Sequence, residues 1–214
     1  MSISKTQEAY SIIKAKIISG ELAPKSDISE EALQAELNVS RTPIREALQL
    51  LQKDGFVDIY PRKGIIVTGI SLDLLNQIYD IRLVLEPFAA KRALGRISDS
   101  FLIKSKEKFL KIWPDDASVA EVEKYYTELD YAFHAAIHKY ADNRFISDVT
   151  TLVSEHEKRV RHITFDIQTN KCCISEHIDI IDAFLDRDLD RLLTAVTTHV
   201  EHARKNVFSQ ILHI

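Results

Sequence analysis

The stretch NVSRTPIREALQLLQKDGF, residues 38–56, decides the fold of the first part of the chain. A tight turn leads into a helix with Pro43 near its first turn, where the missing proline N–H would have no helical partner anyway. Arg41, Thr42 and Arg45 surround this proline, although the N-terminus of a helix repels cations. An external polyanion that docks at this helix end would explain why the arginines stand there.

The residues on either side of this stretch complete a small helical unit with a hairpin. The expected elements are helices over 6–19, 30–37 and from Pro43 to Lys53, and strands over 56–60 and 65–68. Ser29 is the expected N-cap of the second helix, and residues 21–27 form a connector. Helix, helix, turn, helix and hairpin predict a winged helix-turn-helix, whose second motif helix enters the DNA major groove N-terminus first.

Composition limits the remaining possibilities. Of 214 residues, 45% are hydrophobic and 28% charged, with only five Gly and five Pro, which favours a globular protein of long helices. The first ten residues are polar, and no apolar run is long enough to cross a membrane. The adjacent Cys172 and Cys173 are interpreted as reduced thiols of a cytoplasmic protein. The net charge is −4, so any DNA contact must come from local placement of basic residues.

From Ser71 onward only helices are expected. They cover about 71–95, 99–112, 118–141, 143–165, 172–186 and 189–212, with breaks that include Trp113-Pro114 and Thr169-Asn170. The change of pattern near Gly69-Ile70 predicts two domains. Residues 1–69 form the winged helix-turn-helix, and residues 70–214 form an all-helical bundle.

Polar side chains stand at apolar positions on three helices of the second domain. Asp130 and His134 lie four residues apart along the apolar face of one helix, so their side chains point the same way. His177 and His199 lie on the apolar stripes of the two closing helices. Burying such groups is costly unless they are paired or bind a metal.

A lone histidine on an apolar face is usually a satisfied core residue. Three of them with an aspartate favour one mononuclear metal site, because imidazole and carboxylate suit Zn, Ni, Mn or Fe. His138, one turn beyond His134, is a competitor that points further from the apolar face. His156, His162 and His213 are expected to be surface or packing residues.

Arg82 is a second polar residue on an apolar stripe. An ion pair with Glu86, four residues on, is one interpretation. The other is an arginine that faces a cavity and holds a carboxylate by two hydrogen bonds. Both arrangements are compatible with the pattern, in different states of the protein.

The stretch VSRTPIREALQLLQKDGF with its basic wing resembles the DNA-binding domain of the GntR superfamily of bacterial regulators. The helical remainder resembles the FCD effector domain of the FadR-type subfamily. That second resemblance rests on YDIRLVLEPFAAKRA (79–93), LDYAFHAAIHKYADNRF (129–145) and EHIDIIDAFLDRDLDRLLTAVTTHV (176–200). Together the motifs cover nearly the whole chain and imply a mostly α protein, a winged helix-turn-helix followed by an FCD-like bundle.

The resemblance also implies the site residues. The family's metal ligands fall on Asp130, His134, His177 and His199, the same four that the helical faces select. Its DNA contacts fall on Arg41, Thr42 and Arg45 of the recognition helix and on Arg62, Lys63 and Gly64 of the wing. A position that is arginine in some relatives is Glu31 here.

We therefore expect a cytoplasmic, homodimeric repressor, not an enzyme, that binds a short inverted repeat in double-stranded DNA. A divalent metal ion (Zn, Ni or Mn) and a small carboxylate effector held by Arg82 would control its operator affinity. A metal-dependent hydrolase-like enzyme is one alternative, but no motif for a general base is present. A regulator with a structural metal, or none, and an acyl or lipid effector is the other.

Overall fold

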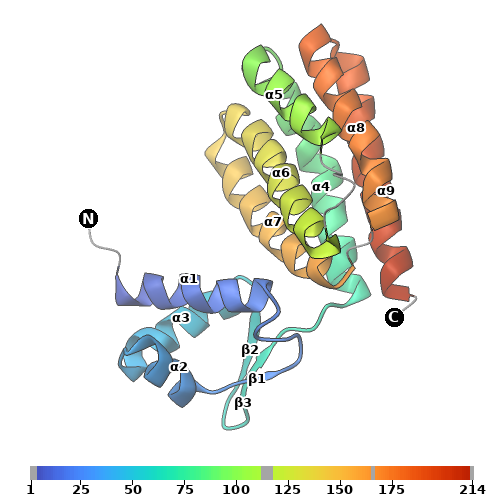
Figure 1. Cartoon of the computed structure of the whole chain (residues 1–214). Helices are drawn as coiled ribbons and strands as arrows, with labels where there is room; N and C mark the ends of the chain where they lie inside the picture. The colour runs from blue at the N-terminus through green and yellow to red at the C-terminus, as the bar shows by residue number, and fades with distance from the viewer. Residues whose placement is uncertain (1–3, 112–117, 165–166, 213–214) are drawn as a thin grey trace. The chain divides into compact units, whose positions relative to one another are not determined.

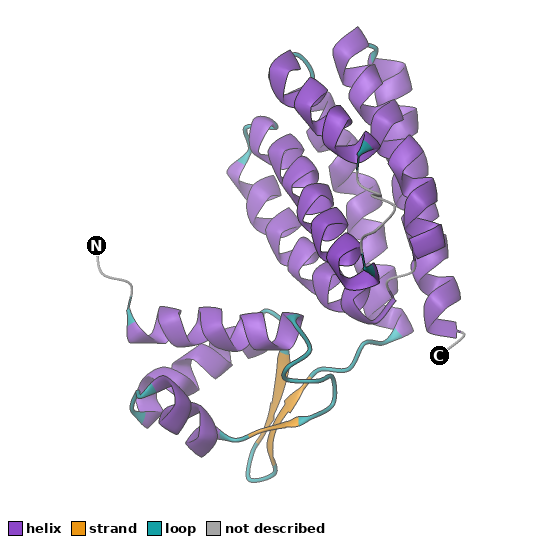
Figure 2. Cartoon of the chain, in the orientation of Figure 1, coloured by secondary structure: helices purple, strands orange, loops and turns teal. Residues whose placement is uncertain are grey.

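The computed structural model describes residues 4–111, 118–164 and 167–212. These residues form nine α-helices and one three-stranded sheet, and the strands are confined to the N-terminal part (Figure 2). The predicted mostly α architecture is confirmed. Contacts divide the chain into two compact units: unit 1 comprises Met1–Ser71 and Glu155–Ile163, and unit 2 comprises Leu72–Ser154 and Thr164–Ile214.

Three helices of unit 1, α1 (Lys5–Ile18), α2 (Glu30–Leu37) and α3 (Arg41–Lys53), enclose a small core. Their buried apolar residues are Ala9, Ile13, Ile17, Leu33, Ile44, Ala47, Leu48 and Leu51. The predicted cap at Ser29 is present, because its hydroxyl accepts the N–H of Ala32. Asn38 closes the turn between α2 and α3 with a left-handed φ of 52°, a conformation that asparagine tolerates better than most residues.

The wing of unit 1 is an antiparallel sheet. β2 (Val57–Tyr60) and β3 (Gly64–Val67) form the predicted hairpin, and β1 (Asp27–Ile28) pairs with the other edge of β3. The sequence predicts a connector up to residue 27, which is wrong for Asp27. A strand of two residues is too short to show an alternating pattern.

The C-terminal half of α7 (Arg144–Thr164) belongs to unit 1. Arg159 is 2% exposed and donates hydrogen bonds to Thr68 Oγ1 (2.9 Å), Thr68 O (2.6 Å) and Gly69 O (3.2 Å). His156 stacks on Phe56 with ring centroids 4.2 Å apart, and its Nε2 lies 2.8 Å from the carbonyl oxygen of Asp54. His156 is therefore a packing residue, buried rather than exposed.

Unit 2 is the helical bundle. Its helices are α4 (Leu72–Ala93), α5 (Asp99–Leu110), α6 (Val119–Tyr140), the first half of α7, α8 (Ile167–Asp186) and α9 (Leu189–Leu212), and they run side by side (Figure 1). Helix α4 contacts α6 and α9, and α8 contacts α5 and α9. The core contains Phe109, Phe133, Ile180, Phe184 and Leu192, all essentially buried.

Two predicted helix boundaries differ from the structure or lie outside it. Helix α8 begins at Ile167, so the predicted break at Thr169-Asn170 is wrong; threonine and asparagine lower helix propensity only modestly. The predicted break at Trp113-Pro114 falls outside the described residues. Cys173 is buried and forms no disulfide among the described residues, whereas the side chain of Cys172 is outside the described part. Among the described residues, no helix has the length and apolar character needed to cross a membrane.

Candidate functional site

The N-terminal part of α3 presents three candidate DNA contacts. Arg41, Thr42 and Arg45 are exposed, and the two arginine side chains are each 60% accessible. The opposite face of α3 is fixed in the core of unit 1, where Ile44 and Leu48 are fully buried. The helix is thus held by its apolar face while the arginines extend into solvent.

Glu30, the first residue of α2, holds both arginines. Its Oε2 lies 2.9 Å from Arg41 Nε, and its Oε1 lies 3.2 Å from Arg45 Nε. Burial raises the pKa of Glu30, but the hydrogen bonds from the two arginines outweigh this and lower it. In the sequence Glu30 is an ordinary acid in the first turn of a helix, so nothing there points to this role. Glu31 is exposed, with one oxygen 3.3 Å from Ser29 Oγ.

The tip of the wing presents the other three candidates. All three are exposed: Arg62 and Lys63 lie between β2 and β3, and Gly64 is the first residue of β3. Arg62 has φ 66° and Gly64 has φ 120°, and the second value is one that glycine adopts without a steric cost. The hairpin therefore ends in a narrow loop that carries two cationic side chains.

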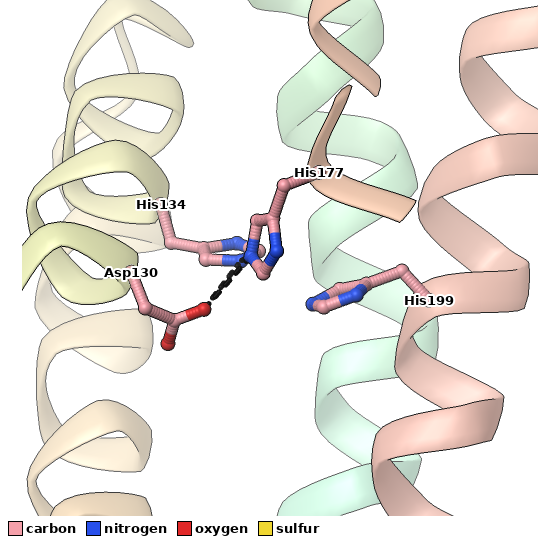
Figure 3. A group of neighbouring side chains, drawn as sticks. All are labelled: Asp130, His134, His177 and His199. Carbon is pink, nitrogen blue, oxygen red and sulfur yellow. Dashed lines mark hydrogen bonds and ion pairs between the residues drawn. The ribbon is translucent and has the colours of Figure 1, made fainter. Parts of the chain in front are cut away.

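The four predicted metal ligands meet in the core of unit 2 (Figure 3). Asp130 and His134 come from α6, His177 from α8 and His199 from α9, and all are buried. His177 Nε2 lies 2.8 Å from Asp130 Oδ1 and 3.4 Å from His134 Nε2, and His134 Nε2 lies 3.8 Å from Asp130 Oδ1. One possible ligand atom from each residue lies within 4.8 Å of all the others.

These separations fit a single ion. Two ligand atoms at about 2.0–2.2 Å from one metal lie roughly 3–4 Å apart. The ring of Phe109 stacks on His177 with centroids 4.5 Å apart and forms an apolar wall beside the cluster. Imidazole and carboxylate donors suit Zn, Ni or Mn, and the geometry alone does not select among them.

The electrostatics around the cluster favour a cation. Burial, followed by the neighbouring His177, lowers the pKa of His199 to about 4, so this imidazole is neutral near pH 7, as a metal ligand must be. Burial also lowers the pKa of His134, but the negative charge of Glu86 and its hydrogen bond outweigh it, and the net direction is upward. His134 thus lies between two carboxylates, Glu86 and Asp130. A divalent ion bound beside it would neutralise their negative charge.

Arg82 forms the ion pair that the sequence left open. Arg82 and Glu86 are each 5% exposed, and Arg82 Nε lies 2.5 Å from Glu86 Oε1. The other oxygen of Glu86 lies 3.3 Å from His134 Nδ1, longer than a well-formed hydrogen bond. Arg82 is therefore linked to the metal-ligand cluster through one shared carboxylate.

His138, the competing histidine, is buried but stands outside the four-residue group. Its Nε2 has no hydrogen-bond partner among the described residues. The structure places His134, and not His138, in the four-residue group; the sequence signal that distinguishes the two is the direction each takes from the apolar face.

Two family comparisons agree with this arrangement. Residues 5–67 match bacterial regulatory proteins of the gntR family, and residues 77–202 match the FCD domain. The chain belongs to the GntR family of regulators with an FCD domain. The predicted family resemblance is confirmed.

Several curated relatives of this GntR-family protein are transcriptional regulators. It is 28% identical over 205 residues to the HTH-type transcriptional repressor RspR of Escherichia coli, a match that covers 94% of this chain and 88% of that protein. It is 28% identical over 197 residues to the Nta operon transcriptional regulator of Aminobacter aminovorans, covering 92% and 90%. It is 31% identical over 134 residues to the gluconate operon transcriptional repressor of Bacillus subtilis, covering 63% and 54%.

Solved structures show the same fold. Escherichia coli McbR/YncC matches 98% of this chain and 100% of that chain, with a TM-score of 0.79 at 18% identity. A GntR transcriptional regulator from a Rhodococcus species matches 97% and 99%, also with a TM-score of 0.79, at 22% identity. The family and its relatives establish that this GntR-family protein is a DNA-binding transcriptional regulator and not an enzyme.

Proposed function

We propose that this regulator is a cytoplasmic repressor whose operator affinity is controlled by a small organic acid bound at a divalent metal centre. DNA binding is assigned to residues 1–69, and metal binding, effector binding and dimerisation to residues 70–214. The observation that carries the proposal is the convergence of Asp130, His134, His177 and His199 in the core, beside Arg82 and Glu86.

DNA recognition is assigned to α3 and the wing. Arg45 would reach a base edge, most readily guanine, which presents two acceptors to a guanidinium. Arg41, Thr42 and Lys63 would contact phosphates, with Arg62 and Gly64 at the wing tip. One recognition helix reads only a few base pairs, so useful affinity requires a homodimer on a short inverted repeat.

Effector recognition is assigned to the metal centre and Arg82. A bound Ni, Mn or five-coordinate Zn ion would supply one or two Lewis-acidic positions for a carboxylate beyond the four protein ligands. Arg82 would hold the far end of the acid by a bidentate hydrogen bond, in exchange for part of its contact with Glu86. Metal and arginine together would then select for both the charge and the length of the ligand.

Effector binding moves the DNA equilibrium only by its differential affinity for the two states of the dimer, typically about 1–3 kcal/mol. The ligand cluster joins α6, α8 and α9, and Arg82 adds α4. A ligand bound at this point would therefore contact four helices of the bundle, which gives it a direct way to favour one arrangement of them.

The test uses two variants of the full-length protein, after a thermal-shift screen of organic acids against metal-loaded wild type has supplied a ligand. His134→Ala should lose both stoichiometric metal and the effector response, yet keep operator binding without effector. Arg82→Ala should keep the metal and bind the acid more weakly. Metal analysis and calorimetric titration measure both, and His162→Ala, which removes an exposed histidine, serves as the control.

The results for His134→Ala distinguish a sensing metal centre from a structural metal and from a wrongly assigned site. If His134→Ala retains stoichiometric metal, the centre is wrongly assigned. If it loses the metal but responds normally to the acid, the metal is structural and the acid binds at another site.

A further inference from the structure

Each of the three histidines of the cluster has an oxygen outside the cluster near its Nδ1, and the Nε2 atoms of His134 and His177 lie near Asp130. The oxygen is at hydrogen-bond distance in His177 and His199 and lies further away in His134. His177 Nδ1 lies 2.7 Å from the carbonyl oxygen of Cys173, His199 Nδ1 lies 2.9 Å from Glu176 Oε2, and His134 Nδ1 lies 3.3 Å from Glu86 Oε2. A carbonyl or carboxylate oxygen can only accept, so the proton is assigned to Nδ1 and the lone pair to Nε2.

Among the three residues that place an oxygen near an Nδ1 atom of these histidines, Glu176 has the best-defined geometry. Its two carboxylate oxygens are divided between two histidines of α9, with Oε2 on His199 and Oε1 2.6 Å from His202 Nδ1. His202 is 45% exposed at its side chain, whereas His199 is 3% exposed. His202 thus holds Oε1 of Glu176 from the solvent side, while Oε2 orients the buried ring of His199.

We propose that Glu176 is a positioning residue of the metal centre, which fixes the tautomer and ring orientation of His199 so that Nε2 is the ligand nitrogen. This inference rests on the metal centre proposed above and assigns a residue outside the four ligands to it. An acceptor on Nδ1 also makes Nε2 a better donor to a metal, and loss of such a partner typically weakens metal binding about 10–100-fold.

No pattern in the sequence singles out Glu176. It stands next to His177 in the chain, yet its contacts are with α9, 23 and 26 residues away. It also lines a surface cavity of about 440 Å³ with Asp179, Arg191 and Thr198. From the sequence alone, Glu176 looks like an ordinary acidic residue on the solvent-facing side of a helix.

The experiment measures metal affinity by competition between the full-length protein and a chromophoric chelator, with Zn²⁺ and with Co²⁺. Glu176→Ala should bind about 10–100-fold more weakly than wild type. Glu176→Gln should lose less, because its amide has one oxygen that can accept from one of the two histidines. The visible absorption of the Co²⁺-loaded protein should change in Glu176→Ala, since that spectrum depends on the ligand set and its geometry.

Two matched controls separate positioning from general damage. Asp179→Ala removes another acid of α8, one that lies 3.5 Å from Arg191, and should leave affinity and Co²⁺ spectrum unchanged. His202→Ala, which frees one carboxylate oxygen, should weaken binding by less than Glu176→Ala. Melting of the metal-free proteins reports any loss of fold by itself.

The outcomes distinguish this inference from the proposal that it rests on. If wild type binds no divalent metal at one ion per chain, the metal centre itself fails. If wild type binds metal and Glu176→Ala shows the same affinity and spectrum, only the role of Glu176 is overturned. Glu176→Met keeps the side-chain length without an acceptor, so it decides the case if the alanine variant does not fold.

Discussion

Arg45 is exposed near the N-terminus of α3, where a guanidinium can reach a base edge. Replacing it with alanine should cost about 1–3 kcal/mol of operator binding and blur preference at one base pair per half-site. Lys63→Ala removes a proposed phosphate contact, so it should instead weaken binding to all sequences alike and flatten the salt dependence of binding. Binding titrations against a panel of single-base operator variants measure both effects. Unchanged affinity and selectivity in Arg45→Ala would show that the assignment is wrong.

Glu30 shares its carboxylate between Arg41 and Arg45, the two arginines that we propose contact DNA. It orients them and also competes with phosphate for them. Glu30→Gln should therefore tighten binding to random DNA, since a negative charge near the backbone is removed, and should lower the ratio of operator to random affinity. Titrations at several salt concentrations test this, with Glu31→Gln as the neighbouring control. An unchanged ratio would mean that the pairing does not orient the arginines.

His138 is a buried histidine without a role in the proposed site, and it should limit stability in acid. Burial lowers its pKa to about 4 from the ordinary 6.5; the negative charge of Glu86 opposes this shift, and His134 and Arg82 add smaller contributions that lower the pKa. Between these values the unfolded chain binds a proton that the folded chain does not, so stability falls as the pH falls through this window. The difference corresponds to about 3 kcal/mol by pH 4.

His138→Gln removes this titration. Its unfolding free energy in urea should drop less between pH 7 and pH 4.5 than that of wild type, both measured with chelator present. His162→Gln, at an exposed position, should behave like wild type. Equal acid sensitivity of wild type and His138→Gln would contradict the assignment.

At the scale of elements, the segment Glu155–Ile163 of α7 completes unit 1. Arg159→Ala should destabilise the protein by about 2–4 kcal/mol, because it leaves the carbonyl groups of Thr68 and Gly69 without their charged donor. Arg159→Lys should recover only part of this lost stability, since an ammonium lacks the planar guanidinium group that donates to both carbonyls. Thermal melting measures the change, and Arg144→Ala, whose side chain is 85% exposed on the same helix, is the control. A melting temperature equal to that of wild type would rule out this role.

A domain made of residues 1–69 alone would also lack His156 and its stack on Phe56. The periodicity of α7 gives no indication of this, because an amphipathic helix does not specify which surface its apolar face covers. The helix itself was predicted from the sequence, but the surface of unit 1 that it packs against was not.

At the scale of the whole molecule, the cluster of candidate metal ligands (Asp130, His134, His177 and His199) connects helices that are distant in sequence. His134 and His199 are 65 residues apart in numbering, yet their rings stack with centroids 5.2 Å apart. A metal bound only by the folded state should stabilise it by about 2.7 kcal/mol at a free concentration of one hundred times the dissociation constant. Chelation should therefore lower the melting temperature of wild type, measured by calorimetry. His177→Ala should show no such difference, and a wild type indifferent to chelation would contradict the metal centre.

The sequence by itself determined the features that depend on a few neighbouring residues. The cap at Ser29, the course of α3 and the hairpin follow from hydrogen bonds and apolar spacing within one or two turns. The four metal-ligand candidates were predictable for the same reason, since each is a polar residue on the apolar face of its own helix.

Only the tertiary structure decided which groups meet across the fold. Glu30 with Arg45, Glu176 with His199, and Arg159 with Thr68 are separated by 15, 23 and 91 residues. Glu30, Glu176 and Arg159 look in the sequence like solvated charges, because helical periodicity shows which face of a helix is buried but not which residues it packs against. Contacts of this kind depend on how the elements cross, and that is set by the packing of the whole core.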